Sequence, residues 1–320
     1  MRASSFSYIG LTLLTTLFTP SYQTPIAPSV DKVFQFPLGT WIENIAVRSN
    51  GQLLVTLLTA PELHLIDPSA NPPTSKLIYS FKEANVTGLL GITELEHDVF
   101  VIVADALPLA ATPGDFAIWK ADFRGQPASI SKIADVPSGQ LLNGIAKLDS
   151  HTLLITDSMA GNIVKLDVKT GKSKPILEDA SMKPGTINGS FVKAGVNGLK
   201  IQDSYVYYTN AALASLYRVR IDCSSGKATG PFEVIASGMP DADDFALQRD
   251  GTAFVAVGSS NVVEKVVPSG GQSVYAGNLD SGRILGPTAA AFGRGKDKDV
   301  LYVVTNGRKE GGSVIAVGLR

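Results

Sequence analysis

The chain alternates short apolar runs with turn residues, and residues 41–56 show the pattern most clearly. A polar pair, Glu43-Asn44, leads into an apolar run, an Asn-Gly turn at Asn50-Gly51, and a second apolar run. Two β-prone runs joined by Asn-Gly are typical of a hairpin with a tight primed turn. The stretch therefore predicts a β-hairpin with a polar pair at its entrance.

This arrangement occurs six times along the chain. The copies begin at Glu43, Leu90, Asn143, Asn197, Asp243 and Pro287, with Leu90 and Pro287 opening the weaker ones. The steps between them are 47, 53, 54, 46 and 44 residues. A regular step of this length indicates a repeat protein, because one such unit cannot bury its own apolar face without neighbours.

Two further strands flank each predicted hairpin. Apolar or alternating runs precede the hairpins at 32–37, 76–81, 129–134, 173–177, 232–236 and 273–276, and follow them at 62–67, 116–121, 162–167, 215–220, 262–266 and 312–317. Four short strands in each repeat predict an all-β fold, a six-bladed β-propeller. The last repeat lacks a strand and residues 32–37 are spare, so we expect the N-terminal strand to complete the last blade and close the ring. Residues 31–320 would then form one propeller.

The balance of charges limits the classes of partner that the chain could bind. Lys and Arg number 28 against 29 Asp and Glu, so the chain lacks the basic excess of a nucleic-acid-binding protein. The single cysteine, Cys223, excludes an intrachain disulfide framework and any CxxC metal site. We therefore expect a small-molecule partner and no nucleic acid.

Residues 1–30 are set apart from the fold. A basic start at Met1-Arg2, an apolar stretch over residues 8–18 and a turn at Thr19-Pro20 resemble a secretory signal peptide. The apolar stretch is too short for a comfortable membrane span, although an uncleaved anchor or a disordered leader is the alternative. The sequons at Asn85 and Asn188 agree with passage through the secretory pathway. We expect a secreted glycoprotein with no membrane association beyond this leader.

In a propeller the innermost strand of every blade lines the axis, so the first residues of the six motifs should meet at one mouth. Four of them carry oxygen donors: Glu43, Asn143, Asn197 and Asp243. Hard divalent cations prefer such ligands. The alternative for each position is a strand-starting residue that bonds only to the backbone. Four such positions at one level favour a polar site.

In these motifs the chain resembles the regucalcin/gluconolactonase-like six-bladed propellers. That resemblance implies one divalent metal on the axis, held by Glu43, Asn143, Asn197 and Asp243. The chain departs from the family at two points, where Glu-Gly-Pro becomes Glu43-Asn44-Ile and Asp-Gly becomes Asp243-Asp244.

A third departure concerns the substrate. The Arg that lactonases of the family use to hold a sugar lactone is replaced by Leu141. With Leu90 and Pro287 at the other mouth positions and Asp244 beside them, we expect a pocket with a polar centre and apolar surroundings. Such a pocket suits a hydrophobic natural product better than a sugar.

The stretch from Trp41 to Thr56 resembles a fungal secondary-metabolism branch that includes hetero-Diels–Alderases of tropolone–sesquiterpene pathways. This resemblance implies a pericyclase that joins an o-quinone methide to a terpene alkene. Asn143, Asn197 and Asp243 would polarise the reactants, Glu43 would assist loss of water from a precursor alcohol, and no cofactor would be required.

Two alternatives remain at this stage. One is a lactone hydrolase that depends on Ca²⁺, Mg²⁺ or Zn²⁺, with Asp243 as the base for the attacking water. The other is a non-catalytic binding propeller, because a fold alone does not fix a function.

Overall fold

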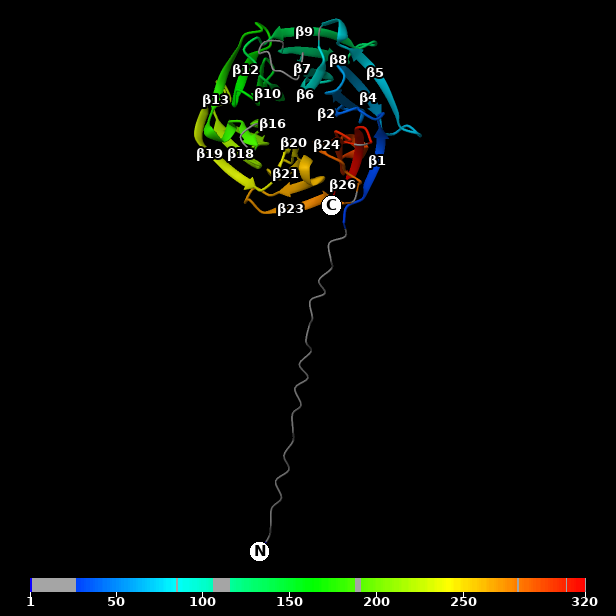
Figure 1. Cartoon of the computed structure of the whole chain (residues 1–320), viewed down its shortest axis with the longest axis vertical. Helices are drawn as coiled ribbons and strands as arrows, with labels where there is room; N and C mark the ends of the chain where they lie inside the picture. Colours follow the sequence, from blue (N-terminus) through cyan, green and yellow to red (C-terminus); the bar gives the residue numbers. More distant parts are fainter. Residues whose placement is uncertain are drawn as a thin grey trace.

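The computed structural model describes residues 1, 27–84, 86–105, 116–187, 191–280, 282–308 and 310–319. Six four-stranded antiparallel sheets stand around one axis as the blades of a ring (Figure 1). The prediction of a six-bladed β-propeller is confirmed.

Each blade runs from its innermost strand outward. Blade 1 contains β2 (Ile42–Val47), β3 (Leu53–Leu57), β4 (Glu62–Asp67) and β5 (Thr74–Ser80); blade 2 contains β6 (Gly88–Glu96), β7 (Val99–Asp105), β8 (Phe116–Asp122) and β9 (Ser129–Asp135); blade 3 contains β10 (Leu142–Asp149), β11 (Thr152–Asp157), β12 (Asn162–Asp167) and β13 (Ser173–Glu178). Blade 4 contains β16 (Val196–Gln202), β17 (Tyr205–Asn210), β18 (Ser215–Ile221) and β19 (Ala228–Ser237); blade 5 contains β20 (Ala242–Leu247), β21 (Ala253–Val257), β22 (Val262–Val266) and β23 (Gln272–Gly277).

Blade 6 closes the ring and is built from both ends of the propeller. Its strands are β24 (Pro287–Phe292), β25 (Val300–Thr305), β26 (Ser313–Gly318) and β1 (Val30–Gln35). β1 pairs antiparallel with β26, with Val30 opposite Val317 and Gln35 opposite Ser313. Closure by the N-terminal strand is therefore confirmed, and it hides two sheet edges that would otherwise be open.

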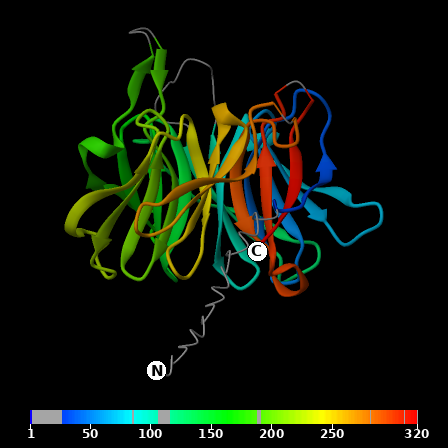
Figure 2. The same cartoon turned by 90° about the horizontal axis from the view of Figure 1, so that it is seen from below.

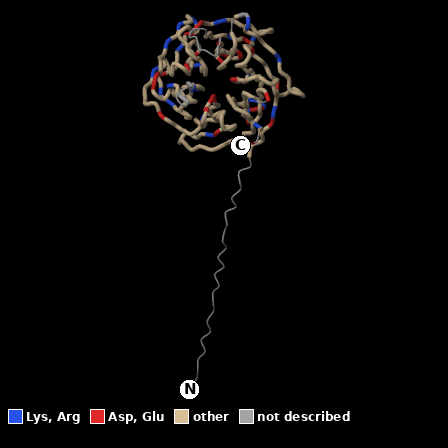
Figure 3. The backbone as a smooth tube through the Cα atoms, viewed as in Figure 1, with Lys and Arg blue, Asp and Glu red and all other residues tan. Residues whose placement is uncertain are grey.

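The hydrophobic core is divided among the six seams between blades. Each seam holds one cluster of buried aliphatic and aromatic side chains drawn from two neighbouring blades. Between blades 2 and 3, for example, Val101 and Val103 pack with Ile145 and Ile155. No blade buries its faces alone, which is the physical reason for the repeat. In Figure 3, residues of both charge signs are spread around the ring.

One element was not predicted. β14 (Gly185–Ile187) and β15 (Phe191–Lys193) form a separate two-stranded sheet between blades 3 and 4, and Figure 2 shows this green hairpin projecting beyond the blades. In the described part of the chain, no helix is long and apolar enough to cross a membrane. Residues 2–26 of the predicted leader and both sequon asparagines, Asn85 and Asn188, lie outside the described residues.

Candidate functional site

Five of the six motif residues occupy equivalent places on their innermost strands: Glu43, Leu90, Asn143, Asn197 and Asp243. In blade 6 the predicted residue is one position off, because Pro287 pairs with Thr305 as Ile42 pairs with Leu57, and Thr288 stands where blade 1 has Glu43. We call the five residues together with Thr288 the mouth ring. In every blade the pairing between the first and second strands shifts register at this level. Bulges of this kind interrupt a ladder and redirect side chains, and they are common next to active sites. The sequence motif therefore marks a ring of six bulges.

Threonine hydroxyl groups tie the bulges of neighbouring blades together. The Thr156 hydroxyl accepts from Gly144 N at 2.7 Å in its own blade and donates to Asn197 O at 2.6 Å in the next. Thr56 and Thr209 make the same two contacts in blades 1 and 4. These bonds satisfy backbone groups that a bulge would leave unpaired in a buried place.

Close packing of the inner strands explains the glycine after Asn143. A Cβ at Gly144 would lie 2.5 Å from Asn197 O, which is closer than real Cβ contacts come. Glycine at this point lets one inner strand approach the next without a side chain between them. The Asn-Gly pair of the third motif is thus a packing feature as well as a source of a polar side chain.

The two carboxyl groups of the mouth ring interact with each other. Glu43 is 6% exposed, and its Oε2 accepts a 2.6 Å hydrogen bond from Trp41 Nε1. Burial, together with the nearby Asp244 carboxylate, raises the pKa of Glu43 to about 7 despite the Trp41 bond. Burial and the proximity of Glu43 and Asp244 raise the pKa of Asp243 well above its usual range. The pair therefore favours protonated carboxyl groups.

Two buried amides complete the polar part of the ring. Asn143 and Asn197 are 6% and 7% exposed. The Asn197 side chain hydrogen-bonds Asp243, while Asn197 Oδ1 is buried without a hydrogen-bond partner among the described residues. The two acids and two amides of this ring offer hydrogen-bond donors to an oxygen that gains negative charge during a reaction.

A second polar layer crosses the axis directly behind the mouth ring. Asn44 Nδ2 donates to Asp244 Oδ2 at 2.9 Å, linking blades 1 and 5, and Lys200 Nζ donates to Asp244 Oδ1 at 2.5 Å. Asn44 and Asp244 both stand where the innermost strands of the other blades have glycine or alanine. The two departures from the family pattern are therefore partners in one buried bond.

The apolar positions of the predicted pocket belong partly to the core. Leu90 is 2% exposed and lies in the cluster between blades 2 and 3, against which the partly buried Leu141 packs. Pro287 is buried at the start of β24. Asp157, at the end of β11, accepts hydrogen bonds from the backbone N–H groups of Gln140 and Leu141. It fixes the backbone that leads into Asn143.

A large cavity lies at the other end of the axis. It measures about 810 Å³ and is lined by residues that follow the mouth ring on the innermost strands, among them Ile45, Ile92, Ile145 and Lys200. We call it the rear cavity. None of the residues predicted for the mouth pocket lines it, and the Asn44–Asp244 layer lies between the two in the order of the strands. The sequence pattern did not predict this cavity.

The donor set of the mouth ring fits a hard divalent cation. Glu43, Asp243, Asn143 and Asn197 supply only oxygen or amide ligands, and the unpartnered Asn197 Oδ1 is a buried acceptor that a cation would satisfy. Among the described residues, no group of three or more His, Cys, Asp and Glu side chains is arranged to hold a metal, so any such site relies on the two amides.

Comparison with known proteins shows which family the chain belongs to. No family model matches it. A protein from Phoma sp, named "Putative hetero-Diels-Alderase", is 31% identical over 345 residues, covering 92% of this chain and 94% of the relative. A relative from Sarocladium schorii, named "Putative hetero-Diels-Alderase asR5", is 30% identical over 311 residues, covering 85% of this chain and 76% of the relative.

Solved structures show the same fold at lower identity. A calcium-binding protein, regucalcin, from Agrobacterium tumefaciens superposes with a TM-score of 0.63 at 17% identity, covering 92% of this chain and 96% of regucalcin. A luciferin-regenerating enzyme has a TM-score of 0.66 at 17% identity, over 91% of this chain and 95% of that enzyme. From the relationship to the Phoma protein across nearly its whole length, the chain belongs to the hetero-Diels–Alderase family of six-bladed β-propellers.

Proposed function

We propose that this protein catalyses a hetero-Diels–Alder reaction between an o-quinone methide and a terpene alkene, as in tropolone–sesquiterpene biosynthesis. The observation that carries the proposal is the 31% identity to a protein of that name across 94% of its length. The mouth ring agrees with it, because such a reaction needs reactants held in one pose and hydrogen bonds to one oxygen.

Formation of the o-quinone methide falls to Glu43 in this proposal. With its pKa raised to about 7, a substantial share of the carboxyl groups is protonated near neutral pH, so Glu43 can donate a proton to the hydroxyl group of a precursor alcohol. The carbon–oxygen bond breaks and water leaves. The proton of the neighbouring ring hydroxyl then passes to the Glu43 carboxylate, which restores the acid and leaves a neutral o-quinone methide.

The cycloaddition itself moves no proton and releases no group. One carbon–carbon and one carbon–oxygen bond form while the heterodiene oxygen gains negative charge. Asn143, Asn197 and protonated Asp243 can stabilise that oxygen by hydrogen bonds, and the fixed propeller wall holds the alkene against one face of the diene. Removing one donor of this kind costs about a hundredfold in rate.

The test is cycloaddition by the purified protein, read out by product enantiomer ratio on a chiral column. We expect a single dominant enantiomer from the wild type and a racemate from Asn143→Ala combined with Asn197→Ala. Asn278→Ala, which removes an exposed amide outside the mouth ring, is the matched control and should keep the selectivity. A wild-type product with the same enantiomer ratio as the reaction in buffer contradicts the proposal.

A second candidate, a metal-dependent lactone hydrolase, is favoured by the unpartnered Asn197 Oδ1 and the all-oxygen donor set. Glu43, Asn143, Asn197 and Asp243 would hold the cation, which would polarise a lactone carbonyl. Asp243 would accept a proton from the attacking water. Stoichiometric Ca²⁺, Mg²⁺ or Zn²⁺ in the purified protein, with lactone hydrolysis lost on chelation and in Glu43→Gln, supports this candidate over the cyclase.

A further inference from the structure

The rear cavity is lined by an excess of cationic side chains. Five basic residues line it, together with one acidic residue, Glu94; the basic residues are Lys147, Lys200, Arg249, Arg294 and Lys298. The chain as a whole has a formal net charge of −1. The positive charge of the cavity is therefore a local concentration, and not a reflection of overall composition.

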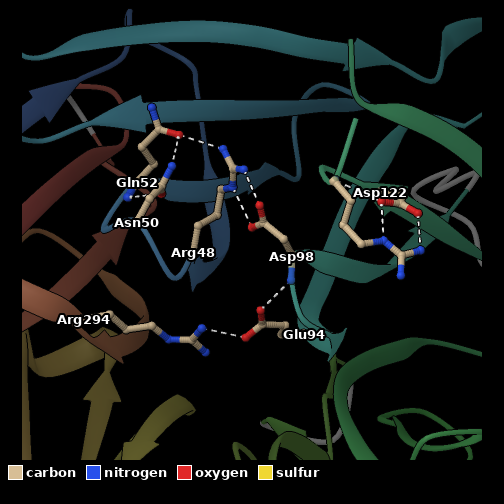
Figure 4. A network of polar contacts seen from close by, with 8 residues as sticks. Arg48, Asn50, Gln52, Glu94, Asp98, Asp122 and Arg294 are labelled. Atoms are coloured by element: carbon tan, nitrogen blue, oxygen red, sulfur yellow. Dashed lines mark hydrogen bonds and ion pairs between the residues drawn. The ribbon is translucent and has the colours of Figure 1, made fainter. Parts of the chain in front are cut away.

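Three of these cations are neutralised by carboxylates. Lys200 is bound to Asp244 at 2.5 Å, and Lys298 lies 3.0 Å from Asp299. Arg294 lies 2.6 Å from Glu94, whose other oxygen accepts from the backbone N–H of Asp98 (Figure 4). Glu94 is thus held by blade 6 and by its own blade, and is not available to the remaining cations.

Two cations of the cavity have no such partner. Neither Lys147 nor Arg249 has a side-chain hydrogen bond or ion pair within the described ranges of the chain. Lys147 lies on β10 in blade 3, and Arg249 follows β20 in blade 5. Lys200, on β16 of blade 4, lies between them in the ring. The free cations therefore flank one sector of the cavity wall, opposite the Arg294–Glu94 pair of blades 6 and 2.

The rest of the wall is mixed, with apolar side chains beside the polar Thr93 and Gln202. Ile45, Ile92, Ile145, Leu247 and Phe292 line the same space, and the volume of about 810 Å³ lies within the range of small-molecule sites. A concave site that combines apolar side chains with a few convergent polar groups is typical of a ligand pocket. Here the convergent groups are cations, so the complementary ligand is an anion with an apolar body.

We propose that the rear cavity binds a small organic anion, with its acidic group at Lys147 and Arg249 and its apolar body against the isoleucine wall. This site is separate from the mouth ring and does not depend on the reaction proposed above. Because both cations are exposed to solvent, the attraction should weaken as salt is added.

The test uses two fluorescent probes with one aromatic body. 8-Anilinonaphthalene-1-sulfonate carries a sulfonate, and N-phenyl-1-naphthylamine is the same framework without it. Each is titrated into the full chain, into the double variant Lys147→Met with Arg249→Met, and into a control, Lys172→Met with Arg220→Met, that removes the same charge from exposed positions outside the cavity.

We expect the sulfonate to bind the wild type and the control equally, and the cavity variant at least about tenfold more weakly, a loss of about 1.4 kcal/mol. The neutral probe should bind all three proteins alike, which also shows that the cavity variant is folded. Unchanged sulfonate affinity in the cavity variant overturns the proposal. Equal affinity of the wild type for the two probes overturns it as well.

Discussion

Replacing Glu43 by Gln should stabilise the protein, and should do so only at higher pH. Glutamine has the shape of a protonated glutamic acid and can still accept the hydrogen bond from Trp41 Nε1, which is 2.6 Å long in the wild type. The substitution therefore removes the ionisable proton and leaves the packing of the mouth ring in place.

The magnitude follows from the pKa of Glu43. In the unfolded chain the carboxyl group ionises near pH 4.5, whereas burial holds its pKa at about 7 in the fold. A raised pKa contributes stability that is complete below pH 4.5, declines as the pH rises, and is lost above pH 7. The difference is worth about 3 kcal/mol. The substitution also removes the repulsion between Glu43 and Asp243, which raises the pKa of Asp243. This second effect stabilises the variant at high pH as well.

The assay is urea unfolding at pH 5 and pH 8, with a chelator present so that no divalent cation holds the carboxylates. Glu264→Gln makes the same chemical change on β22, outside the mouth ring, and serves as the matched control. We expect Glu43→Gln to exceed the wild type by about 3 kcal/mol at pH 8 and by little at pH 5. An equal difference at both pH values would refute the claim that Glu43 is held protonated by burial.

Other expectations concern the same ring. Thr156→Val should cost about 2 kcal/mol in urea unfolding, because Gly144 N and Asn197 O each lose a buried partner, while Thr156→Ser should restore most of it. Gly144→Ala should cost about 1–3 kcal/mol through the clash with Asn197 O, whereas Gly125→Ala, where a Cβ meets only one atom at 3.9 Å, should change stability little. If Glu43 is the acid, dehydration of the precursor alcohol should slow as the pH rises through about 7, and a flat pH–rate profile would contradict that role.

The architecture follows from local patterns, and the sequence therefore predicts it well. Tight turns, alternating strands and a nearly regular step depend on residues near one another in the chain, so six blades and their closure by a spare strand could be derived. The β14–β15 hairpin was missed because its segments are three residues long and it lies in a stretch rich in glycine. Such short strands give no periodic signal.

The contacts across the axis could not be derived in the same way. Asn44 and Asp244 are 200 residues apart, and their bond depends on the ring bringing blades 1 and 5 within reach. Both are departures from the family motif, and the fact that each places a polar side chain at the same motif position was the available signal. The rear cavity was missed because its basic residues follow the motifs at different intervals, as Lys147 and Arg249 do.

The pairing of β1 with β26 joins the two ends of the propeller and holds the ring closed. Val30 and Val317 face each other although 287 positions separate them, and contacts of such long range form late in folding. During synthesis, β1 can pair with β26 only when the chain is almost complete. Loss of β26, by proteolysis or by a premature stop codon, would expose the edge of β25. It would also expose the hydrophobic core on both sides of blade 6 to solvent. We therefore expect only the complete ring to be stable, and truncated forms to unfold and be degraded.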